Sequence, residues 1–462
     1  MAVRQQNAQY NKMMHTPVHR LIVALAIPTI ISMMISSLYN AADTYFVGRL
    51  GTSASAATGI VFGLMAVLQA VGFMCGHGSG SIVARYLGQK KTEDASVTVS
   101  TGLALVVIIT LLITTFGLIF VDPLMRLLGA TPTILPYARI YGRCILAAAP
   151  FITASFLMNN VLRYEGRATL GTIGLSTGAL LNIAGDPILM YKCHLGILGA
   201  GLSTALSQVI AFGLLLYFFR AGRTTTQLSW RRVRLKGAVI FEILSVGMPS
   251  LCRQGLSTVS TLLLNFAAAG WGDAAISAMS IVNRITFMIF AVVIGIGQGL
   301  QPVAGFSYGA QAWKRLKSAF VFTVSLSTGV ALALALAVGL NAKGVVSAFI
   351  GDPKVIAIAA PALVYQCAAL VFAPPFTMTN MTYQSAGIAG KATFLALLRN
   401  GLCFIPLILI LPRTLGLLGV QAAQPIADGL TFLIALPFTL NLLKTLNQRA
   451  GDSHIKKIRP HP

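Results

Sequence analysis

The sequence predicts an all-α integral membrane protein of twelve transmembrane helices, arranged as two six-helix lobes related by a pseudo-two-fold axis along the membrane normal. Composition is the first reason. Hydrophobic residues make up 56% of the chain, charged residues 10%, and mean hydropathy is +0.79, whereas a soluble domain carries about a quarter charged residues. The second reason is a series of long apolar runs, and the third is an internal repeat.

The apolar runs define the individual spans, because about 20 such residues are needed for a helix to cross the hydrocarbon layer. Several runs are longer than this, so tilted helices or protruding ends are expected. The first run follows a polar, basic stretch and is too long for a cleavable signal. The predicted spans are 21–47, 54–84, 96–121, 134–162, 169–191, 196–219, 238–269, 275–308, 318–341, 356–385, 392–412 and 417–443.

Lys and Arg residues lie mostly in the short loops between the spans, and their distribution predicts the orientation. Both terminal segments and the loops after the second, fourth, sixth, eighth and tenth spans are basic, while the opposite loops hold few cations. Cytoplasmic loops carry such an excess. We therefore expect a multi-pass protein of the cell inner (cytoplasmic) membrane with both termini in the cytoplasm. The net charge of +23 then reflects topology, so the expected partner is the lipid bilayer and not nucleic acid.

The two halves of the chain align at a shift of 221 residues, without a gap from Pro28 to Gly88. The shift pairs Pro28 with Pro249 and Gly51 with Gly272. Chance similarity between apolar segments does not explain matched Pro and Gly positions at a steady offset. Each half holds an even number of helices, so the two copies enter the membrane from the same side, as parallel repeats.

The repeat predicts two domains. The N-lobe, residues 1–236, comprises the first six helices with a cytoplasmic N-terminus and a basic inter-lobe linker. The C-lobe, residues 237–462, comprises the last six helices with a cytoplasmic basic tail. Two similar lobes are suited to alternating access, in which one lobe rocks against the other around a central site.

Two acidic residues within apolar runs are the strongest functional candidates, Asp43 in the first span and Asp186 in the fifth. A carboxylate in a span costs several kcal/mol unless it is protonated, paired or ion-bound. Asn182 precedes Asp186 by four residues, which places both on one helical face, and Tyr39 and Asn40 can reach the face of Asp43. These groups suit either H+ or Na+. The alternative is that both acids lie at the outer membrane edge.

Three further positions stand out. Pro28 lies on the same helix as Asp43, where proline breaks a backbone bond and bends the helix, so it is a candidate hinge. Asp428 in the last span is expected to pair with Arg284 or Arg399, or else to attract a cationic substrate. His77 in the second span is expected to pack.

The motifs IPTIISMMISSLYNAADTYFVGRLG in the first span and LNIAGDPILM in the fifth, together with the six-plus-six repeat, resemble the multidrug and toxic compound extrusion (MATE) transporters, in their bacterial DinF/MepA-like branch. The resemblance covers nearly the whole chain. It implies a secondary active antiporter that exports hydrophobic, often cationic, compounds in exchange for H+ or Na+. It also implies a monomer without a cofactor.

By this resemblance, Asn182, Asp186, Thr204 and either Asn159 or Asn160 gather with Asp43 in the N-lobe. A Na+ ion would then be held by Asp43, Asn182, Asp186 and Thr204. Other MATE branches carry a Glu in the seventh helix, whereas this chain has only Arg253 within that span and Glu242 at its start. The repeat position of Asp43 is Leu264. Coupling is therefore expected in the N-lobe.

Sequence features bear on three other functions: a flippase, a membrane enzyme and a channel. A lipid-linked saccharide flippase of a related fold would line its cleft with cations, and Arg253, Arg284 and Arg399 keep that alternative open. A membrane enzyme is disfavoured because the chain contains no HExxH, GxSxG or P-loop motif. A channel is disfavoured because two duplicated lobes with acids in one of them favour alternating access.

Overall fold

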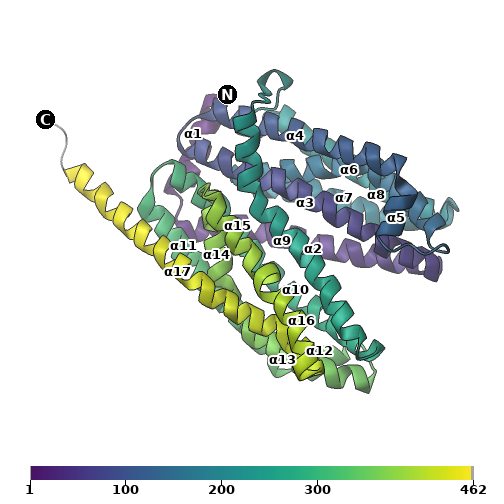
Figure 1. Ribbon diagram of the computed structural model, residues 1–462. Coiled ribbons are helices and arrows are strands. Elements are labelled where there is room, and N and C mark those ends of the chain that lie inside the picture. The colour runs from purple at the N-terminus through teal and green to yellow at the C-terminus, as the bar shows by residue number, and fades with distance from the viewer. Residues whose placement is uncertain (1, 459–462) are drawn as a thin grey trace. The chain divides into compact units, whose positions relative to one another are not determined.

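The computed structural model describes residues 2–458, with side chains from residue 6 to residue 451. Every regular element in this part of the chain is a helix (Figure 1). The first half contains α1 (Ala2–His15), α2 (Val18–Gly48), α3 (Thr52–Gly88), α4 (Thr92–Ile119), α5 (Val121–Leu127), α6 (Leu135–Tyr164), α7 (Ala168–Pro187), the π-helical turn η1 (Ile188–Lys192), α8 (Gly196–Arg220) and the 3₁₀ turn η2 (Trp230–Arg232).

The second half repeats this order. It contains α9 (Gly237–Ala269), α10 (Asp273–Gly309), α11 (Trp313–Leu340), α12 (Ala342–Ser347), α13 (Pro353–Leu370), α14 (Ala373–Ser385), α15 (Ala389–Leu397), the π-helical turn η3 (Leu398–Cys403), α16 (Phe404–Leu415) and α17 (Leu417–Ile458). All twelve predicted spans are helical. Three of them change form along their length: the fifth runs from α7 into η1, the tenth divides into α13 and α14, and the eleventh passes through η3. Part of the predicted basic tail lies outside the residues whose side chains are described.

Eleven of the helices in the described residues are long and apolar enough to cross a membrane. The helix α9 corresponds to the seventh predicted span, 238–269, but is not among them, because Glu242, Arg253 and Gln254 lower its hydropathy. Large apolar side chains are exposed along the long helices, such as Leu112 (56%) and Phe116 (60%) on α4. A surface of this kind faces lipid more readily than water.

The internal repeat is visible in the geometry of the helices and turns. The helices α3 and α10 each have 37 residues, and α4 and α11 each have 28. Gly51 and Gly272, which precede α3 and α10, have φ values of 118° and 87°, a region that L side chains rarely adopt. The π-helical turns η1 and η3 also correspond. The duplication inferred from matched Gly and Pro residues is therefore structural.

The chain forms two compact units whose boundaries differ from the lobes predicted to divide at residue 236. Unit 1 comprises residues 1–15 and 27–251, and unit 2 comprises residues 16–26 and 252–462. Each division falls inside a helix, two residues from Pro28 in α2 and from Pro249 in α9. The first part of each of these helices is therefore assigned to the unit built from the other half of the chain.

Glycine contacts explain this assignment. A Cβ atom added to Gly78 of α3 would lie 2.1 Å from the carbonyl oxygen of Ile243 in α9, and one added to Gly247 of α9 would lie 2.0 Å from that of Met74. In unit 2, a Cβ on Gly299, the repeat position of Gly78, would lie 2.8 Å from the Ile22 oxygen of α2. Only glycine allows backbones this close, so the start of each helix is held against the other half.

The linker between the two halves is an ordered part of unit 1. The buried carboxylate of Glu165, which follows α6, accepts hydrogen bonds from the backbone N–H of Thr225 at 2.7 Å and of Thr226 at 3.0 Å, and from the Thr226 hydroxyl. Ser96, Ser100 and Thr101 of α4 accept hydrogen bonds from linker N–H groups at 3.0–3.2 Å. Hydroxyls in the first turns of α4 and one carboxylate thus fix the linker.

Candidate functional site

Asp43 occupies the interior of unit 1, where two tyrosines approach it. Its side chain is 1% exposed, and Oδ2 accepts a hydrogen bond of 3.5 Å from the hydroxyl of Tyr141 on α6. Tyr39, four residues before Asp43 on α2, is 8% exposed and lies within electrostatic reach of Asp43 and Asp186. Their spacing of four residues on α2 places Tyr39 and Asp43 on the same buried face of the helix.

The second part of the group comes from α7 and α8. Asn182 Nδ2 lies 3.2 Å from Asp186 Oδ1 and 3.0 Å from the Thr204 hydroxyl, and all three side chains are at most 1% exposed. The Ser203 hydroxyl donates to the Asn182 carbonyl oxygen at 3.2 Å. The close approach of α8 is allowed by Gly185, where a Cβ would lie 2.6 Å from Ser203 Oγ.

The two carboxylates belong to one electrostatic group, since Asp43 and Asp186 interact with each other. Four of its buried oxygens have no hydrogen-bond partner among the described residues: Tyr39 Oη, Asp43 Oδ1, Asn182 Oδ1 and Asp186 Oδ2. Leaving such atoms unsatisfied is costly. Three of them are pure acceptors when the acids are ionised, so the arrangement has the chemistry of a site for a proton or a hard cation.

These oxygen donors fit an alkali cation better than a transition metal. Carboxylate, amide and hydroxyl oxygens suit hard cations, whereas His and Cys suit zinc and its neighbours. In the described part of the chain there is no group of three or more His, Cys, Asp or Glu residues that could hold a metal ion. The oxygen atoms of Asp43, Asn182, Asp186 and Thr204 thus have the chemistry that suits a Na+ ion, and the two carboxylates have the chemistry that suits a proton.

Three predicted members lie elsewhere. Asn40 is exposed, although it lies only three residues before Asp43 on α2. Asn160 is buried, but its amide donates to the Phe156 carbonyl oxygen at 2.7 Å and accepts from the guanidinium of Arg163. Asn159 faces α7 beside Gly171, where a Cβ would lie 2.7 Å from its Nδ2. The expectation that Asn40, Asn159 or Asn160 joins Asp43 is not supported by these contacts.

Asn160 belongs instead to a second buried cluster of unit 1. Arg163, 4% exposed, lies 3.1 Å through its guanidinium from His77 Nε2, and His77 Nδ1 lies 3.0 Å from the Phe73 carbonyl oxygen. The ring of His77 also meets that of Tyr164 edge-on, at 6.1 Å between centroids. His77 thus packs against Tyr164 and contacts the buried guanidinium of Arg163.

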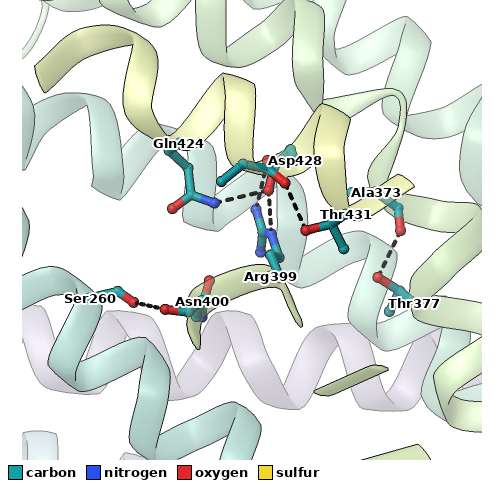
Figure 2. A network of polar contacts seen from close by, with 9 residues as sticks. Ser260, Ala373, Thr377, Arg399, Asn400, Gln424, Asp428 and Thr431 are labelled. Carbon is teal, nitrogen blue, oxygen red and sulfur yellow. Dashed lines mark hydrogen bonds and ion pairs between the residues drawn. The ribbon is translucent and has the colours of Figure 1, made fainter. Parts of the chain in front are cut away.

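In unit 2, Asp428 of α17 forms an ion pair with Arg399 of η3. Its oxygens lie 2.7 Å from Nε and 3.1 Å from an Nη atom of Arg399, and Gln424 Nε2 lies 2.9 Å away (Figure 2). The Asp428 side chain is fully buried, while that of Arg399 is 15% exposed. Of the two partners predicted for Asp428, Arg399 is the one used, and Arg284 is exposed.

Sequence reasoning missed two members of the Asp43 group, Tyr141 and Ser203. Both are residue types that occur throughout the spans, and neither stands at a helical spacing from an acid on its own helix. The useful signal for Ser203 was its position beside Thr204. Tyr141 had no such signal, because only the packing of α6 against α2 directs its hydroxyl toward Asp43.

Comparisons with known proteins show which family and which solved structures the chain is similar to. The sequence model of the family described as MatE matches residues 28–188 and 249–410, which are the two halves of the repeat. The multidrug export protein MepA of Staphylococcus haemolyticus is 26% identical over 444 residues, which cover 96% of this chain and 96% of that protein.

Two solved structures are similar over nearly the whole chain. One is described as the outward-facing conformation of a multidrug resistance MATE family transporter of the MOP superfamily, with a TM-score of 0.88 and 27% identity over 95% of this chain and 98% of that one. The other is a MOP superfamily transporter from Pyrococcus furiosus, described as having a binding pocket of reverse polarity that suggests a different function. It has a TM-score of 0.88 and 26% identity over 94% and 98% of the two chains.

Proposed function

The chain belongs to the MatE family, and from that premise we propose that it is a secondary active multidrug antiporter. It exports hydrophobic, often cationic, compounds in exchange for H+ or Na+ by alternating access. As a member of this family it is a multi-pass membrane transporter and not an enzyme. Drug export is the activity that the names of the relatives state. The exchange with an ion is inferred from the residues of this chain.

One observation carries the proposal, the cluster of unsatisfied oxygens around Asp43 and Asp186. Two carboxylates buried in membrane helices repel each other unless a cation or a proton lies between them. Loss of that ion raises the free energy of the conformation that buries both acids and favours a different conformation. An antiporter requires this coupling between ion release and conformational change. Pro28 stands within two residues of the division between the units in α2, so we propose it as the hinge.

The distribution of charge among the loops supports a placement in the membrane. We infer that the protein lies in the cytoplasmic membrane as a monomer, with both termini in the cytoplasm. The excess of Lys and Arg in alternate loops supports this orientation.

The flippase alternative needs a cleft rich in uncompensated cations. Arg399 is neutralised by Asp428, and Arg284 is exposed, so two of the three arginines that kept this alternative open do not serve it. The relatives named as multidrug export proteins also favour drugs over lipid-linked sugars.

Proteoliposomes test the proposal. Purified protein is reconstituted, a fluorescent cationic dye is loaded, and efflux is followed under an imposed pH gradient or an imposed Na+ gradient, separately. We expect efflux to be driven by one gradient in the wild type and to be abolished in Asp43→Asn, which keeps the side-chain shape but removes the charge. Asp273→Asn, at an exposed acid, serves as the control.

The result that would overturn the proposal is also clear. If Asp43→Asn vesicles match the wild-type rate under the driving gradient, the acids do not couple transport. If wild-type vesicles move no dye under either gradient but translocate a lipid pyrophosphate, the multidrug assignment is wrong and the flippase alternative replaces it.

A further inference from the structure

The last part of the linker, Trp230–Lys236, combines exposed apolar side chains with exposed cations. Trp230 is 75% exposed and Leu235 is 54% exposed. Three cations of the segment are exposed as well: Arg231, Arg234 and Lys236. This combination suits the boundary between membrane and water, where an aromatic ring can enter the headgroup layer and cations can meet lipid phosphates.

The backbone of this segment is fixed to α4 on both sides of Trp230. The N–H of Ser229 donates to the hydroxyl oxygen of Ser100 at 3.2 Å. The N–H of Arg234 donates to the hydroxyl oxygen of Thr101 at 3.0 Å. The turn η2 lies between these two hydrogen bonds, so its side chains are presented by a bonded backbone beside α4 and do not belong to a free loop.

The same contacts indicate the depth of the segment in the membrane. About 20 residues of a helix cross the hydrocarbon layer. Counted back from Ile119, where α4 ends, this length reaches Ser100. Ser100 and Thr101, to which the segment is bonded, therefore lie at the edge of the hydrocarbon. The neighbouring Trp230 is then at the level of the headgroups, where tryptophan is enriched in membrane proteins.

The positive charge of the segment is only partly matched by acids. The sequence contains no Asp or Glu between Asp186 and Glu242. Glu93 and Asp94 begin the neighbouring α4, and Glu93 lies 3.3 Å from Nε of Arg232. Three cations of the segment form no ion pair with a described residue, namely Arg231, Arg234 and Lys236. An anion at this surface therefore meets uncompensated positive charge.

We propose that Trp230–Lys236 binds the headgroups of anionic phospholipids, with its three unpaired cations as the charged partners and Trp230 as the ring that enters the headgroup layer. Arginine and phosphate form charge-assisted hydrogen bonds. One cation close to the membrane favours an anionic over a neutral surface by roughly fivefold. A soluble acidic partner would need a surface clear of the lipid, which the contacts with Ser100 and Thr101 do not provide. The inference goes beyond the proposed export function, because this lipid is bound and not transported.

Tryptophan fluorescence tests the inference in the full-length protein. The chain has three tryptophans, so Trp271→Phe and Trp313→Phe leave Trp230 as the reporter. The protein is placed in phosphatidylcholine nanodiscs in which about 20 mol% of the lipid is replaced by brominated phosphatidylglycerol or by brominated phosphatidylcholine, a charged and a neutral quencher. Bromine on the acyl chain, near the headgroup, quenches a tryptophan that it contacts.

We expect brominated phosphatidylglycerol to quench Trp230 roughly two to three times more than brominated phosphatidylcholine. At this mole fraction, a fivefold preference gives the anionic lipid roughly half of the contacts with the segment, whereas the brominated neutral lipid competes equally with its unbrominated form and takes about one fifth. High salt should bring the two values together, because exposed charges are screened.

Two matched variants of the reporter protein locate the effect. Arg231→Gln with Arg234→Gln should remove most of the difference between the two lipids, and the backbone N–H that Thr101 accepts is kept. Lys343→Gln with Lys354→Gln removes two exposed cations outside the linker and should leave the difference unchanged. The salt dependence of the reporter with its native linker decides the question if the linker variant does not fold.

Three results would overturn the inference. The first is equal quenching by the two lipids at low salt. The second is no quenching by either lipid, which would place Trp230 in water and leave the segment to a soluble acidic partner. The third is an undiminished difference in the linker variant. Failure of dye efflux under both gradients, with the lipid difference intact, would contradict the export proposal alone.

Discussion

The hydroxyl of Tyr141 donates a hydrogen bond to Asp43 from a position 98 residues further along the chain, and both side chains are 1% exposed. The distance of 3.5 Å is at the long end for such a bond. Among the described residues it is the only hydrogen bond of the Asp43 carboxylate, so the orientation of this acid depends on α6 as much as on its own helix.

Replacing Tyr141 with Phe should reduce coupled efflux without loss of folding. The ring keeps its packing, while Asp43 loses a donor. A hydrogen bond as long as this one contributes about 0.5–1.5 kcal/mol, so we expect transport to fall by up to roughly tenfold in the proteoliposome assay. Tyr365→Phe is the control, because Tyr365 is 40% exposed. Equal rates in Tyr141→Phe and wild type would show that the contact is not used.

Asp43 and Asp186 should behave as one site. Groups that share an ion or a proton are strongly non-additive. The double variant with Asp43→Asn and Asp186→Asn should therefore lose little more coupled efflux than either single variant. Rates are measured under the gradient that drives the wild type. Substantial activity in each single variant, with losses that multiply in the double variant, would contradict a shared site.

Breaking the Arg399–Asp428 pair should destabilise the protein. Asp428→Asn leaves a guanidinium without its counter-charge, at a cost of roughly 3–5 kcal/mol for a buried pair, and the lower end is expected because Arg399 is 15% exposed. Adding Arg399→Gln should restore much of the melting temperature. Asp122→Asn breaks a pair with Arg139 whose side chains are 38% and 40% exposed, so it should cost less than about 1 kcal/mol. Equal losses at the two pairs would argue against this account.

Glu165 should make the anchoring of the linker depend on pH. Burial raises the pKa of Glu165 above its ordinary value of 4.5, and the donors from Thr226 and Thr225 lower it only in part. The folded state therefore favours the protonated acid. Its contribution to stability is fully present below about pH 4.5 and is lost as the pH rises through the raised pKa.

Thermal unfolding of Glu165→Gln and of the wild type, measured from below pH 4.5 to neutral pH, tests the contribution of Glu165 to stability. The variant should show a smaller fall in melting temperature with rising pH. Glu93→Gln, at an exposed glutamate 3.3 Å from Arg232 of the linker, should follow the wild type. A pH profile that is the same in wild type and Glu165→Gln would remove this carboxylate as the cause.

Gly78→Ala should destabilise the protein although alanine favours helices. The added Cβ would lie 2.1 Å from the Ile243 oxygen, and relief requires a backbone shift that costs about 1–3 kcal/mol. Gly59 of the same helix has no atom within 4 Å of an added Cβ, so Gly59→Ala should be neutral or stabilising by up to about 1 kcal/mol. Melting temperatures of both variants are compared, and a drop in Gly59→Ala alone would contradict the packing described for α3 and α9.

The spans and the repeat were predictable because hydropathy and the recurrence of Gly and Pro are properties of the chain itself. The same holds for Asn182 and Asp186, whose spacing of four residues puts them on one face. The helix α1 was not predicted, since it is polar, and its burial of Met13 (2% exposed) depends on tertiary contacts.

What could not be predicted was which helix each inward face meets. Asn160 and Tyr141 both lie on α6 and are buried, yet Asn160 contacts Arg163 while Tyr141 reaches Asp43. Their residue types do not distinguish these outcomes. The division of the chain inside α2 and α9 was missed for the same reason, because it depends on how closely Gly78, Gly247 and Gly299 let two backbones approach.

The exchange of helix starts makes the two halves of the chain depend on each other. One six-helix copy buries the glycine face of its second long helix only by taking the beginning of a helix from the other copy. A break in the chain at residue 236 would therefore leave each half without a segment of its own compact unit, residues 237–251 for unit 1 and residues 16–26 for unit 2.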